Sequence, residues 1–460
     1  MRPAWTSGVV TSTRHTGAAQ SFPVAIRNSG TPAKPPVFRE IDVMDQNPVI
    51  IVGAGLAGLC CAKELGKRGI PVILLESHSV PGGRVRTDLV DGFQLDHGFQ
   101  VLQTAYPEAA AQLNYTALQL QPFAPGALIR TRGGFVEMSD PWRRPGKLFT
   151  TLFNGVGTFS DRLRLARLRL RVSRLSDEQI QAVPDQSTRT FLLQTCGFSE
   201  DIVNRFFRPW FSGVFLEKDL ATSSHYFQFL FRIFATGNAS LPSEGMASIP
   251  RQLAASLPAG TLRTNTQVNS VTPREVRLTS GETLSARAVV LAVQGPEASR
   301  LSQGAIPAPG ACSTTCFYFA APKAPFSQPL LVLNGDESGP INNLSVVSNV
   351  APSYAPAGKA LISVSVVGDH AANLKQTEAA IRLQLKSWYG ASTDEWSMLR
   401  AYPIHFALPA QPPGFQAAAG PLLKTANGLF TCGDSTTTAS IHGAMLSGRL
   451  VARDVAMETR

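Results

Sequence analysis

The chain has 460 residues, of which 44% are hydrophobic and 16% are charged, and its net charge is +10. This composition supplies sizeable apolar cores and excludes a disordered or low-complexity protein. The sequence contains no run of about 18 apolar residues, which argues against a membrane-spanning helix. At about 100–200 residues per domain, the length predicts two or three domains.

The positive charge is concentrated in two segments. Residues 1–39 carry five basic residues and no acid, and residues 141–175 carry nine basic residues against one acid. The rest of the chain is slightly acidic, which argues against nucleic acid as a partner. The six cysteines show no disulfide framework and the seven histidines include no HxxxH pair. We therefore predict a reducing compartment and no metal site.

Residues 1–43 precede the first predicted strand and lack amphipathic periodicity. Their acid-poor composition, with Arg, Ser, Thr, Ala and Pro, resembles that of organelle transit peptides. A mis-assigned start is the alternative, because Met44 directly precedes the first strand. In both cases the segment is expected to lie outside the fold. A transit peptide implies a plastid or mitochondrion, whereas a bacterial start implies a cytoplasmic or peripheral membrane protein.

A strand, a glycine-rich turn, a helix and a second strand follow one another at residues 48–76. The apolar run 48–52 is typical of a buried parallel strand, Leu59–Arg68 is predicted to be helical, and 71–75 forms the next strand. This order predicts a dinucleotide-binding unit rather than an ordinary turn.

The turn itself has GxGxxG spacing. Gly53 permits a tight turn, Gly55 lets the backbone approach a pyrophosphate, and Gly58 allows the helix to pack closely on the strand. Unpaired N–H groups at the N-terminus of the helix that follows, and the positive end of the helix dipole, favour phosphate, so Leu56 and Ala57 of the turn are candidate cofactor contacts.

An acid and a second glycine motif follow the second strand. Glu76 lies 18 residues after the last glycine of the turn, where a carboxylate accepts hydrogen bonds from ribose hydroxyls. Gly82, Gly83 and Arg84 then place flexible backbone and a guanidinium just beyond the ribose position. Arginine pairs well with phosphate oxygens.

At this point the sequence resembles the flavin-containing amine oxidase superfamily, which includes monoamine oxidases, protoporphyrinogen oxidases, and carotenoid desaturases and isomerases. Three further segments match in order. Leu95–Gln100 is similar to the strand beside the flavin, residues 260–293 are predicted to form a β-meander that includes Ala288–Ala292, and Gly428–Asp434 precedes a last helix.

The resemblance implies FAD as the cofactor and assigns roles to individual residues. Gly98 lies in the strand beside the flavin, the backbone of Val268 holds the adenine, and the Asp434 carboxylate binds a ribityl hydroxyl. The predicted cofactor-binding residues are Gly53, Gly55, Leu56, Ala57, Gly58, Glu76, Gly83, Arg84, Gly98, Val268, Gly433, Asp434, Gly443 and Ala444. No second GxGxxG occurs, so oxygen or a quinone is expected as the electron acceptor rather than NAD bound to its own domain.

The resemblance also implies an α/β fold in which a Rossmann-type FAD-binding domain is interleaved with an α+β substrate domain. Residues 46–121, 240–299 and 416–460 are assigned to the FAD-binding domain, and residues 122–239 and 300–415 to the substrate domain. The first substrate segment has a helical pattern and is rich in Phe, which either lines an apolar pocket or forms core. Runs at 330–333 and 360–367 predict strands of a sheet over the flavin.

Two departures separate the chain from monoamine oxidases. Ser440 stands where such enzymes carry one of two aromatic side chains flanking the flavin, and residues 401–409 lack a cysteine for covalent attachment. We therefore expect non-covalent FAD and a relative of carotenoid desaturases and protoporphyrinogen oxidases. His405 and His442 either face the flavin or the pocket, or have packing or surface roles.

The expected function is that of an FAD-dependent oxidoreductase: a dehydrogenase, oxidase or desaturase. It transfers a hydride from a bulky apolar substrate, such as a carotenoid or porphyrinogen, to flavin N5. No catalytic residue of the protein is predicted. The alternatives are a flavin-dependent carotenoid isomerase, an amine oxidase, and a non-catalytic lipid-chaperone binder of the same fold.

The arginine-rich segment 162–174 is ambiguous. Its alternation suggests a strand, but Arg and Leu are good helix formers and Asp161 after Ser160 is a plausible helix start. As a helix the segment shows no clean apolar face. It is either a solvated surface or a site of peripheral contact with an anionic membrane or an acidic partner.

Overall fold

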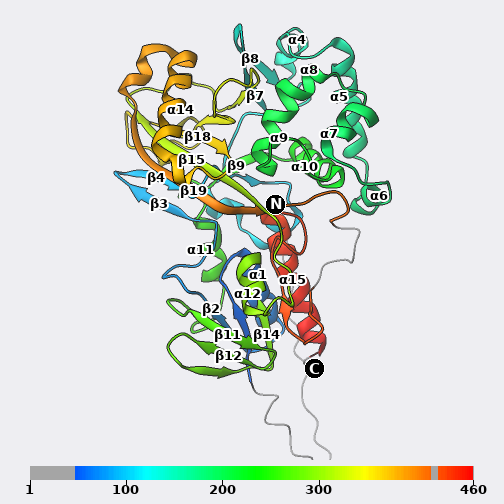
Figure 1. The fold of residues 1–460 in the computed structure, drawn as a ribbon, viewed down its shortest axis with the longest axis vertical. Coiled ribbons are helices and arrows are strands. Elements are labelled where there is room, and N and C mark those ends of the chain that lie inside the picture. The colour runs from blue at the N-terminus through cyan, green and yellow to red at the C-terminus, as the bar shows by residue number, and fades with distance from the viewer. Residues whose placement is uncertain (1–46, 416–422, 459–460) are drawn as a thin grey trace, which may run out of the picture. The chain divides into compact units, whose positions relative to one another are not determined.

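The computed structural model describes residues 47–415 and 423–458, whose helices and strands are drawn in Figure 1. The predicted leader or alternative start at residues 1–43 lies outside the described residues. The fold of the described chain is α/β, as predicted, and it contains a parallel sheet with helices packed on it.

The parallel sheet has five strands in the order β10-β2-β1-β14-β20. The strands are β10 (Leu262–Arg263), β2 (Val72–Leu75), β1 (Val49–Val52), β14 (Ala288–Leu291) and β20 (Phe430–Thr431). All four residues of β1 and of β14 are buried, because both faces of this sheet are covered.

Helices α1 (Leu56–Lys67) and α15 (Ile441–Glu458) pack against each other beside this sheet, in the lower half of Figure 1. Their approach is close because both are glycine-containing. A Cβ atom on Gly448 would lie 2.1 Å from the carbonyl oxygen of Ala57. The C-terminal helix is thereby held next to the predicted nucleotide-binding turn.

A three-stranded antiparallel meander is formed by β11 (Val268–Thr272), β12 (Glu275–Leu278) and β13 (Thr283–Ser285). The prediction that Ala288–Ala292 belongs to this meander is wrong. Residues 288–291 form β14, which pairs in parallel with β1 from Val49↔Ala288 onward. The run is apolar at every position, so it requires a strand buried on both faces, which the meander does not provide.

The second large sheet has seven strands in the order β19-β15-β18-β17-β16-β7-β8, mostly antiparallel. The strands are β19 (Ser397–Pro409), β15 (Ala311–Ala321), β18 (Ala360–Val367), β17 (Asn343–Val346), β16 (Leu331–Asn334), β7 (Gly126–Thr131) and β8 (Gly134–Ser139). The strands predicted at 330–333 and 360–367 are confirmed as β16 and β18. Helix α14 (Leu374–Tyr389) covers one face through Ile381, Leu385 and Trp388.

The hairpin β7–β8 was missed by the sequence analysis, which found only a helical pattern in residues 122–239. It joins the sheet because β7 pairs in parallel with β16, about 200 residues later in the chain. The rest of this segment is largely helical, at the upper right of Figure 1. Its elements are α4 (Leu148–Leu152), α5 (Phe159–Val172), α6 (Asp177–Gln181), α7 (Thr188–Thr190), η3 (Phe191–Thr195), α8 (Glu200–Ile202), η4 (Val203–Phe207), α9 (Arg208–Phe215) and α10 (Ser224–Thr236).

The arginine-rich segment is helical, within α5, and the helix begins earlier than Asp161. Thr158 is the N-cap residue, and its side chain and that of Asp161 form a reciprocal capping box. Burial tends to raise the pKa of Asp161, but hydrogen bonds from Ser199 and Thr158 outweigh it and lower the pKa to about 2.

The remaining described elements are mostly shorter and lie outside these three sheets. They are β3 (Thr87–Val90), β4 (Phe93–Asp96), β5 (Leu102–Gln103), β6 (Gln121–Pro122), β9 (Ala239–Leu241), α2 (Pro107–Gln112), α3 (Tyr115–Leu118), η2 (Pro145–Lys147), α11 (Ser248–Ala255), α12 (Gly295–Leu301), α13 (Val347–Val350), η5 (Pro352–Tyr354), η6 (Ala371–Asn373) and η7 (Gly390–Glu395). All strands of the parallel sheet lie in the three segments assigned to the FAD-binding domain. The division of the chain into these two domains stays a prediction.

Candidate functional site

The glycine-rich turn after β1 is built as its spacing predicts. Gly53 has a positive φ of 102°, and its N–H donates to the Leu75 carbonyl at 2.8 Å. A Cβ on Gly58 would lie 2.0 Å from the Gly53 carbonyl oxygen, and a Cβ on Gly53 would lie 2.8 Å from that of Ala292. These two glycines are therefore required for packing of the turn itself.

Gly55 differs from its two neighbours in the motif. It is the N-cap residue of α1, and a Cβ placed on it would meet no atom within 4 Å. Gly83 lies beside it, since a Cβ on Gly83 would approach the Gly55 Cα to 3.4 Å. The open space next to Gly55, at a helix N-terminus that begins with Leu56 and Ala57, fits a phosphate group.

The Glu76 carboxylate is held against this turn at the end of β2. Glu76 is 5% exposed, its Oε2 accepts from the Ala54 N–H at 2.9 Å, and its Oε1 accepts from the His78 N–H at 3.0 Å. The backbone around Val268 is tied to the same point, because the Thr266 N–H donates to the Glu76 carbonyl at 2.8 Å. The ribose acid and the adenine strand of the sequence prediction thus adjoin each other.

An ion pair joins the first and last of the three segments assigned to the FAD-binding domain. Arg84 Nη2 donates to Asp434 Oδ1 at 2.6 Å, and Arg84 Nη1 donates to the Ala407 carbonyl at 2.7 Å. Asp434 Oδ2 has no protein donor within the described part of the chain. The preceding residue, Gly433, is fixed by its N–H donating to Ser447 Oγ of α15 at 2.9 Å. Residues predicted separately to bind phosphate and ribityl hydroxyl therefore lie in contact.

The remaining predicted residues lie further from this ion pair, and no hydrogen bond between described residues links them to it directly. Gly98 has φ +89°, and its carbonyl accepts from the Tyr318 hydroxyl at 3.4 Å. Gly443 and Ala444 begin α15, where both N–H groups donate to Ser440, to Oγ and to the carbonyl respectively. Sequence reasoning placed Gly443 and Ala444 in the correct helix. The prediction that Gly98 lies in a strand is wrong, because β4 ends at Asp96 and the positive φ of Gly98 bends the chain away from the extended conformation.

Arg86 and Gln100 were missed. Arg86 Nε and Nη2 are buried without a hydrogen-bond partner among the described residues, as is Gln100 Oε1. Gln100 Nε2 donates to the Arg84 carbonyl at 2.9 Å, so these groups lie around the Arg84 segment. Buried polar groups in proteins are almost always paired, so these atoms fit a polar ligand such as FAD. The only sequence signal is that Arg86 follows the Gly-Gly-Arg triplet by two residues.

A buried carboxyl lies just before Gly98. Asp96 accepts from the Thr87 hydroxyl and the Met246 N–H at Oδ1 and from the Tyr354 hydroxyl at Oδ2. Burial raises the pKa of Asp96 to about 6, and these hydrogen bonds limit the rise. The carboxyl joins the start of the predicted flavin strand to two other segments.

Replacing Asp96 with Asn is expected to remove a pH-dependent part of the stability. Because the folded-state pKa is raised, the contribution is present in full below pH 4 and is lost as the pH rises through about 6. A rise of about two pKa units corresponds to about 3 kcal/mol. Denaturant unfolding at several pH values should show the wild type losing that much relative to the variant between pH 4 and 7. An Asp394→Asn variant, at an exposed pair with Lys386, should show no such change, and equal pH slopes for the wild type and Asp96→Asn would contradict the assignment.

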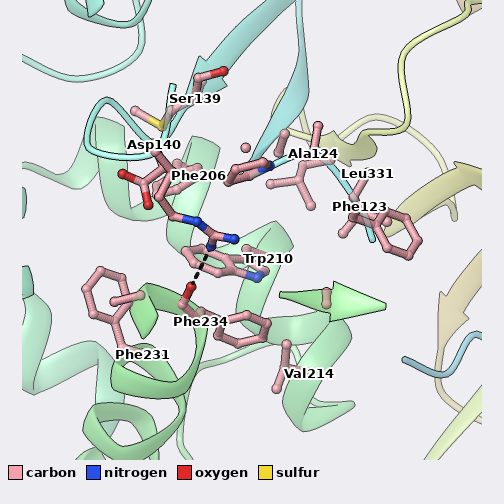
Figure 2. Close-up of a pocket in the computed structure, with 18 of the residues that line it drawn as sticks. Phe123, Ala124, Ser139, Asp140, Phe206, Trp210, Val214, Phe231, Phe234 and Leu331 are labelled. Carbon is pink, nitrogen blue, oxygen red and sulfur yellow. Dashed lines mark hydrogen bonds between the residues drawn. The ribbon is translucent and has the colours of Figure 1, made fainter. Parts of the chain in front are cut away.

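An apolar cavity of about 230 Å³ lies between the helical segment and the seven-stranded sheet (Figure 2). Trp210 is at its centre, with ring centroids 5.3 Å from Phe206 and 5.0 Å from Phe234. Its wall also includes Phe99 and Val101, directly after Gly98. The cavity therefore extends to the strand that the resemblance places beside the flavin.

Polar groups gather in one part of this cavity wall. Arg143 Nη1 donates to the Gly237 carbonyl at 2.8 Å, and Arg169 donates to Asp140 Oδ2 at 2.6 Å. Desolvation by burial lowers the pKa of Arg143. These cations are already occupied by carbonyl and carboxylate oxygens, and the rest of the lining is mostly apolar. Gln103 and Asn343 are exceptions, since buried amide atoms of both lack a partner among the described residues, so the cavity is suited to a largely apolar ligand.

The Phe-rich segment serves both of the predicted purposes. Phe206, Phe231 and Phe234 line the cavity, whereas Phe207 and Phe211 are completely buried in the core. The two candidate histidines have other roles. His442 is buried against Tyr106 and Phe229, and burial lowers its pKa, whereas His405 is exposed and pairs with Asp369.

The family can be stated at this point. A family described as flavin containing amine oxidoreductase matches residues 56–456, and the chain belongs to this family of flavin-dependent oxidoreductases. The chain is 38% identical over 87 residues to a hydroxyneurosporene desaturase from Rubrivivax gelatinosus, covering 18% of this chain and 16% of that protein. It is 28% identical over 173 residues to coproporphyrinogen III oxidase from Propionibacterium freudenreichii subsp. freudenreichii, covering 36% and 31% respectively.

Solved structures share the fold over most of the chain. An oxidoreductase from Methanosarcina mazei superposes with a TM-score of 0.71 at 16% identity, covering 88% of this chain and all of that one. Cyclohexylamine oxidase from Brevibacterium oxydans gives 0.65 at 17% identity, covering 90% and 99%. No described helix has both the length and the apolar character needed to cross a membrane, and the described His, Cys, Asp and Glu side chains form no cluster suited to a metal.

Proposed function

We propose that the protein binds FAD non-covalently and dehydrogenates a bulky apolar substrate such as a carotenoid or porphyrinogen. The observation that carries this proposal is the aromatic cavity around Trp210, which extends to Phe99 beside the predicted flavin strand. The names of the relatives, a desaturase and a porphyrinogen oxidase, support the same substrate classes.

The chain's own residues hold and orient the two molecules. Glu76 would accept from ribose hydroxyls, Gly55 and the start of α1 would hold the pyrophosphate, and Asp434 Oδ2 would accept from a ribityl hydroxyl. When bound, FAD supplies a two-electron acceptor at its N5 atom. The hydride that leaves the substrate as the new double bond forms would pass to that acceptor, the accompanying proton would be released to solvent, and oxygen or a quinone would reoxidise the reduced flavin.

The cavity residues would shield and position the substrate. The titratable side chains among the described lining residues are Asp140, Arg143 and Arg169, and Asp140 is paired with Arg169, so none of them is assigned as a general base. Peripheral contact of residues 162–174 with a membrane is part of the proposal, because an apolar substrate partitions into lipid. The location is proposed as cytoplasmic or peripheral membrane for a bacterial protein, and as a plastid or mitochondrion if residues 1–43 act as a transit peptide.

Anaerobic bleaching of the flavin tests this function. Purified protein should absorb near 450 nm, and carotenes or porphyrinogens should bleach it, whereas amines should not. Absence of flavin absorbance, even after adding FAD, would contradict the cofactor. Rapid bleaching by a primary amine would identify an amine oxidase instead, and a shifted double bond without mass change would identify an isomerase.

A larger side chain in the cavity wall tests whether the cavity binds the substrate without disturbing the bound flavin. Val214→Phe places a larger side chain in the cavity wall and should lower kcat/KM about tenfold or more while leaving the flavin spectrum unchanged. Val183→Phe, at an exposed position outside the cavity, is the matched control. Equal kcat/KM values for the two variants would show that the cavity is not the substrate site.

A further inference from the structure

Exposed apolar side chains are concentrated on α4, on α5 and at Trp142, which contacts α5 through Arg169. Among the described residues, seven of the thirteen exposed large hydrophobic side chains lie between positions 142 and 170. Phe149 is 74% exposed, Phe153 is 80% exposed and Phe159 is 67% exposed. We call this set the α4–α5 surface, and its apolar members are Trp142, Leu148, Phe149, Phe153, Phe159, Leu163 and Leu170.

Helix α5 has two distinct faces, contrary to the expectation that it has no clean apolar face. Phe159, Leu163 and Leu170 are spaced by four and seven residues, which puts them on one outward face. Leu168 and Val172 are buried on the opposite side. The expectation failed because both faces contain leucine, and only the packing shows which leucines are covered.

The two helices of this surface are fixed to each other. Arg162 is buried, its Nε donates to the Thr151 carbonyl at 3.1 Å, and its Nη2 donates to Asn154 Oδ1 at 2.6 Å. One of the arginines of the basic run therefore fastens α5 to the end of α4. The exposed aromatic side chains are thus presented by connected elements.

Positive charge borders the same surface. Arg167, Arg171 and Arg174 are exposed, and none has a carboxylate partner within the described residues, whereas Arg164 pairs with Asp161 and Arg169 with Asp140. Exposed aromatic side chains next to unpaired arginines fit the interface of a bilayer that contains anionic lipids.

The α4–α5 surface adjoins the cavity. Trp142 is 52% exposed and also lines the cavity, and the Arg169 guanidinium lies over its ring at 4.9 Å. Leu165 and Arg169 of α5 belong to the cavity wall, so the helix with the exposed apolar face also bounds the substrate site. We infer that the α4–α5 surface docks on an anionic membrane and that apolar substrates pass from the lipid past Trp142 into the cavity.

This inference takes the apolar nature of the substrate from the proposed function. Membrane docking can be measured without any substrate, by flotation. Flavin-loaded full-length protein is floated with phosphatidylcholine vesicles and with vesicles that also contain phosphatidylglycerol. The wild type should float with the anionic vesicles, and high salt should weaken this binding. The triple variant Arg167→Glu, Arg171→Glu, Arg174→Glu should bind about tenfold more weakly or worse. The triple variant Phe149→Ser, Phe153→Ser, Phe159→Ser should also lose binding.

Two controls match these variants in chemistry. Leu383→Ser removes an apolar side chain that is 74% exposed on α14, and Lys323→Glu, Lys359→Glu, Lys375→Glu reverses three exposed charges elsewhere. Both should float like the wild type. On detergent-dispersed substrate all variants should keep wild-type turnover, but on substrate dissolved in anionic vesicles the two docking variants should be slower.

Several results would overturn the inference. The inference would be overturned if flotation did not depend on anionic lipid. It would also be overturned if the two docking variants floated like their controls. A dimer that the Phe→Ser variant breaks, without any flotation, would show that the surface binds a second copy, and binding of acidic protein alone would show a protein partner. Turnover of detergent-dispersed substrate by a protein that does not float would contradict membrane docking but not the proposed function. Absence of bound flavin would contradict the proposed function itself.

Discussion

Replacement of Gly55 by Val is expected to leave the protein folded and to abolish flavin binding. A Cβ at this position meets no described protein atom within 4 Å, and the backbone is extended at φ −72° and ψ 179°, so valine introduces no backbone strain. The isopropyl group would instead fill the space predicted for the pyrophosphate. We expect flavin affinity to fall about 100-fold or more, which corresponds to about 2.7 kcal/mol.

Flavin absorbance of the purified variant and titration with FAD measure this effect. Gly66→Ala is the matched control, because Gly66 lies in the same helix and a Cβ there also meets nothing within 4 Å. That variant should bind flavin normally and gain about 0.5–1 kcal/mol of stability. A Gly55→Val protein that purifies yellow, with wild-type affinity, would show that the turn does not hold the cofactor.

Removal of the Asp434 carboxylate is expected to lower both the stability of the protein and its affinity for flavin. Asp434→Ala leaves Arg84 without its carboxylate partner in a largely buried site, and it removes the oxygen proposed to bind the ribityl chain. The apoprotein should lose about 2 kcal/mol of unfolding free energy, and flavin affinity should fall roughly 10–100-fold.

Denaturant unfolding of apoprotein and flavin titration separate the two consequences. Asp394→Ala serves as the control, because its partner Lys386 is exposed and such pairs contribute less than about 1 kcal/mol. If Asp434→Ala loses stability but binds flavin with unchanged affinity, the carboxylate is structural and the proposed contact with the cofactor is wrong. If it loses neither, the ion pair has no role.

The conformation of the glycine-rich turn could be predicted from sequence because its geometry is local. Gly53, Gly55 and Gly58 lie within six residues between a strand and a helix, and the conformation of such a segment depends on those residues themselves. Glu76 follows from the same short-range logic, since it ends the next strand. The resemblance to a known family then supplied the distant segments, including Gly433 and Asp434.

Other features depend on contacts that sequence patterns do not specify. Ala288–Leu291 reads as a strand, but whether it continues the meander or pairs with β1 is decided by which sheet can bury both of its faces. The hairpin β7–β8 joins its sheet through a partner about 200 residues away. Neither relation has a local signal in the chain.

The sequence determined the class of fold through the family resemblance. By itself it determined the glycine-rich turn and the richness in aromatic residues, because adjacent residues encode local backbone geometry and composition. Only the tertiary structure decided that Arg84 pairs with Asp434, that Phe206 lines a cavity while Phe207 is core, and that Phe159 and Leu163 face outward. Which side of a helix is buried depends on the elements packed against it. Those elements come from distant parts of the chain, so the substrate site and the α4–α5 surface exist only in the folded molecule.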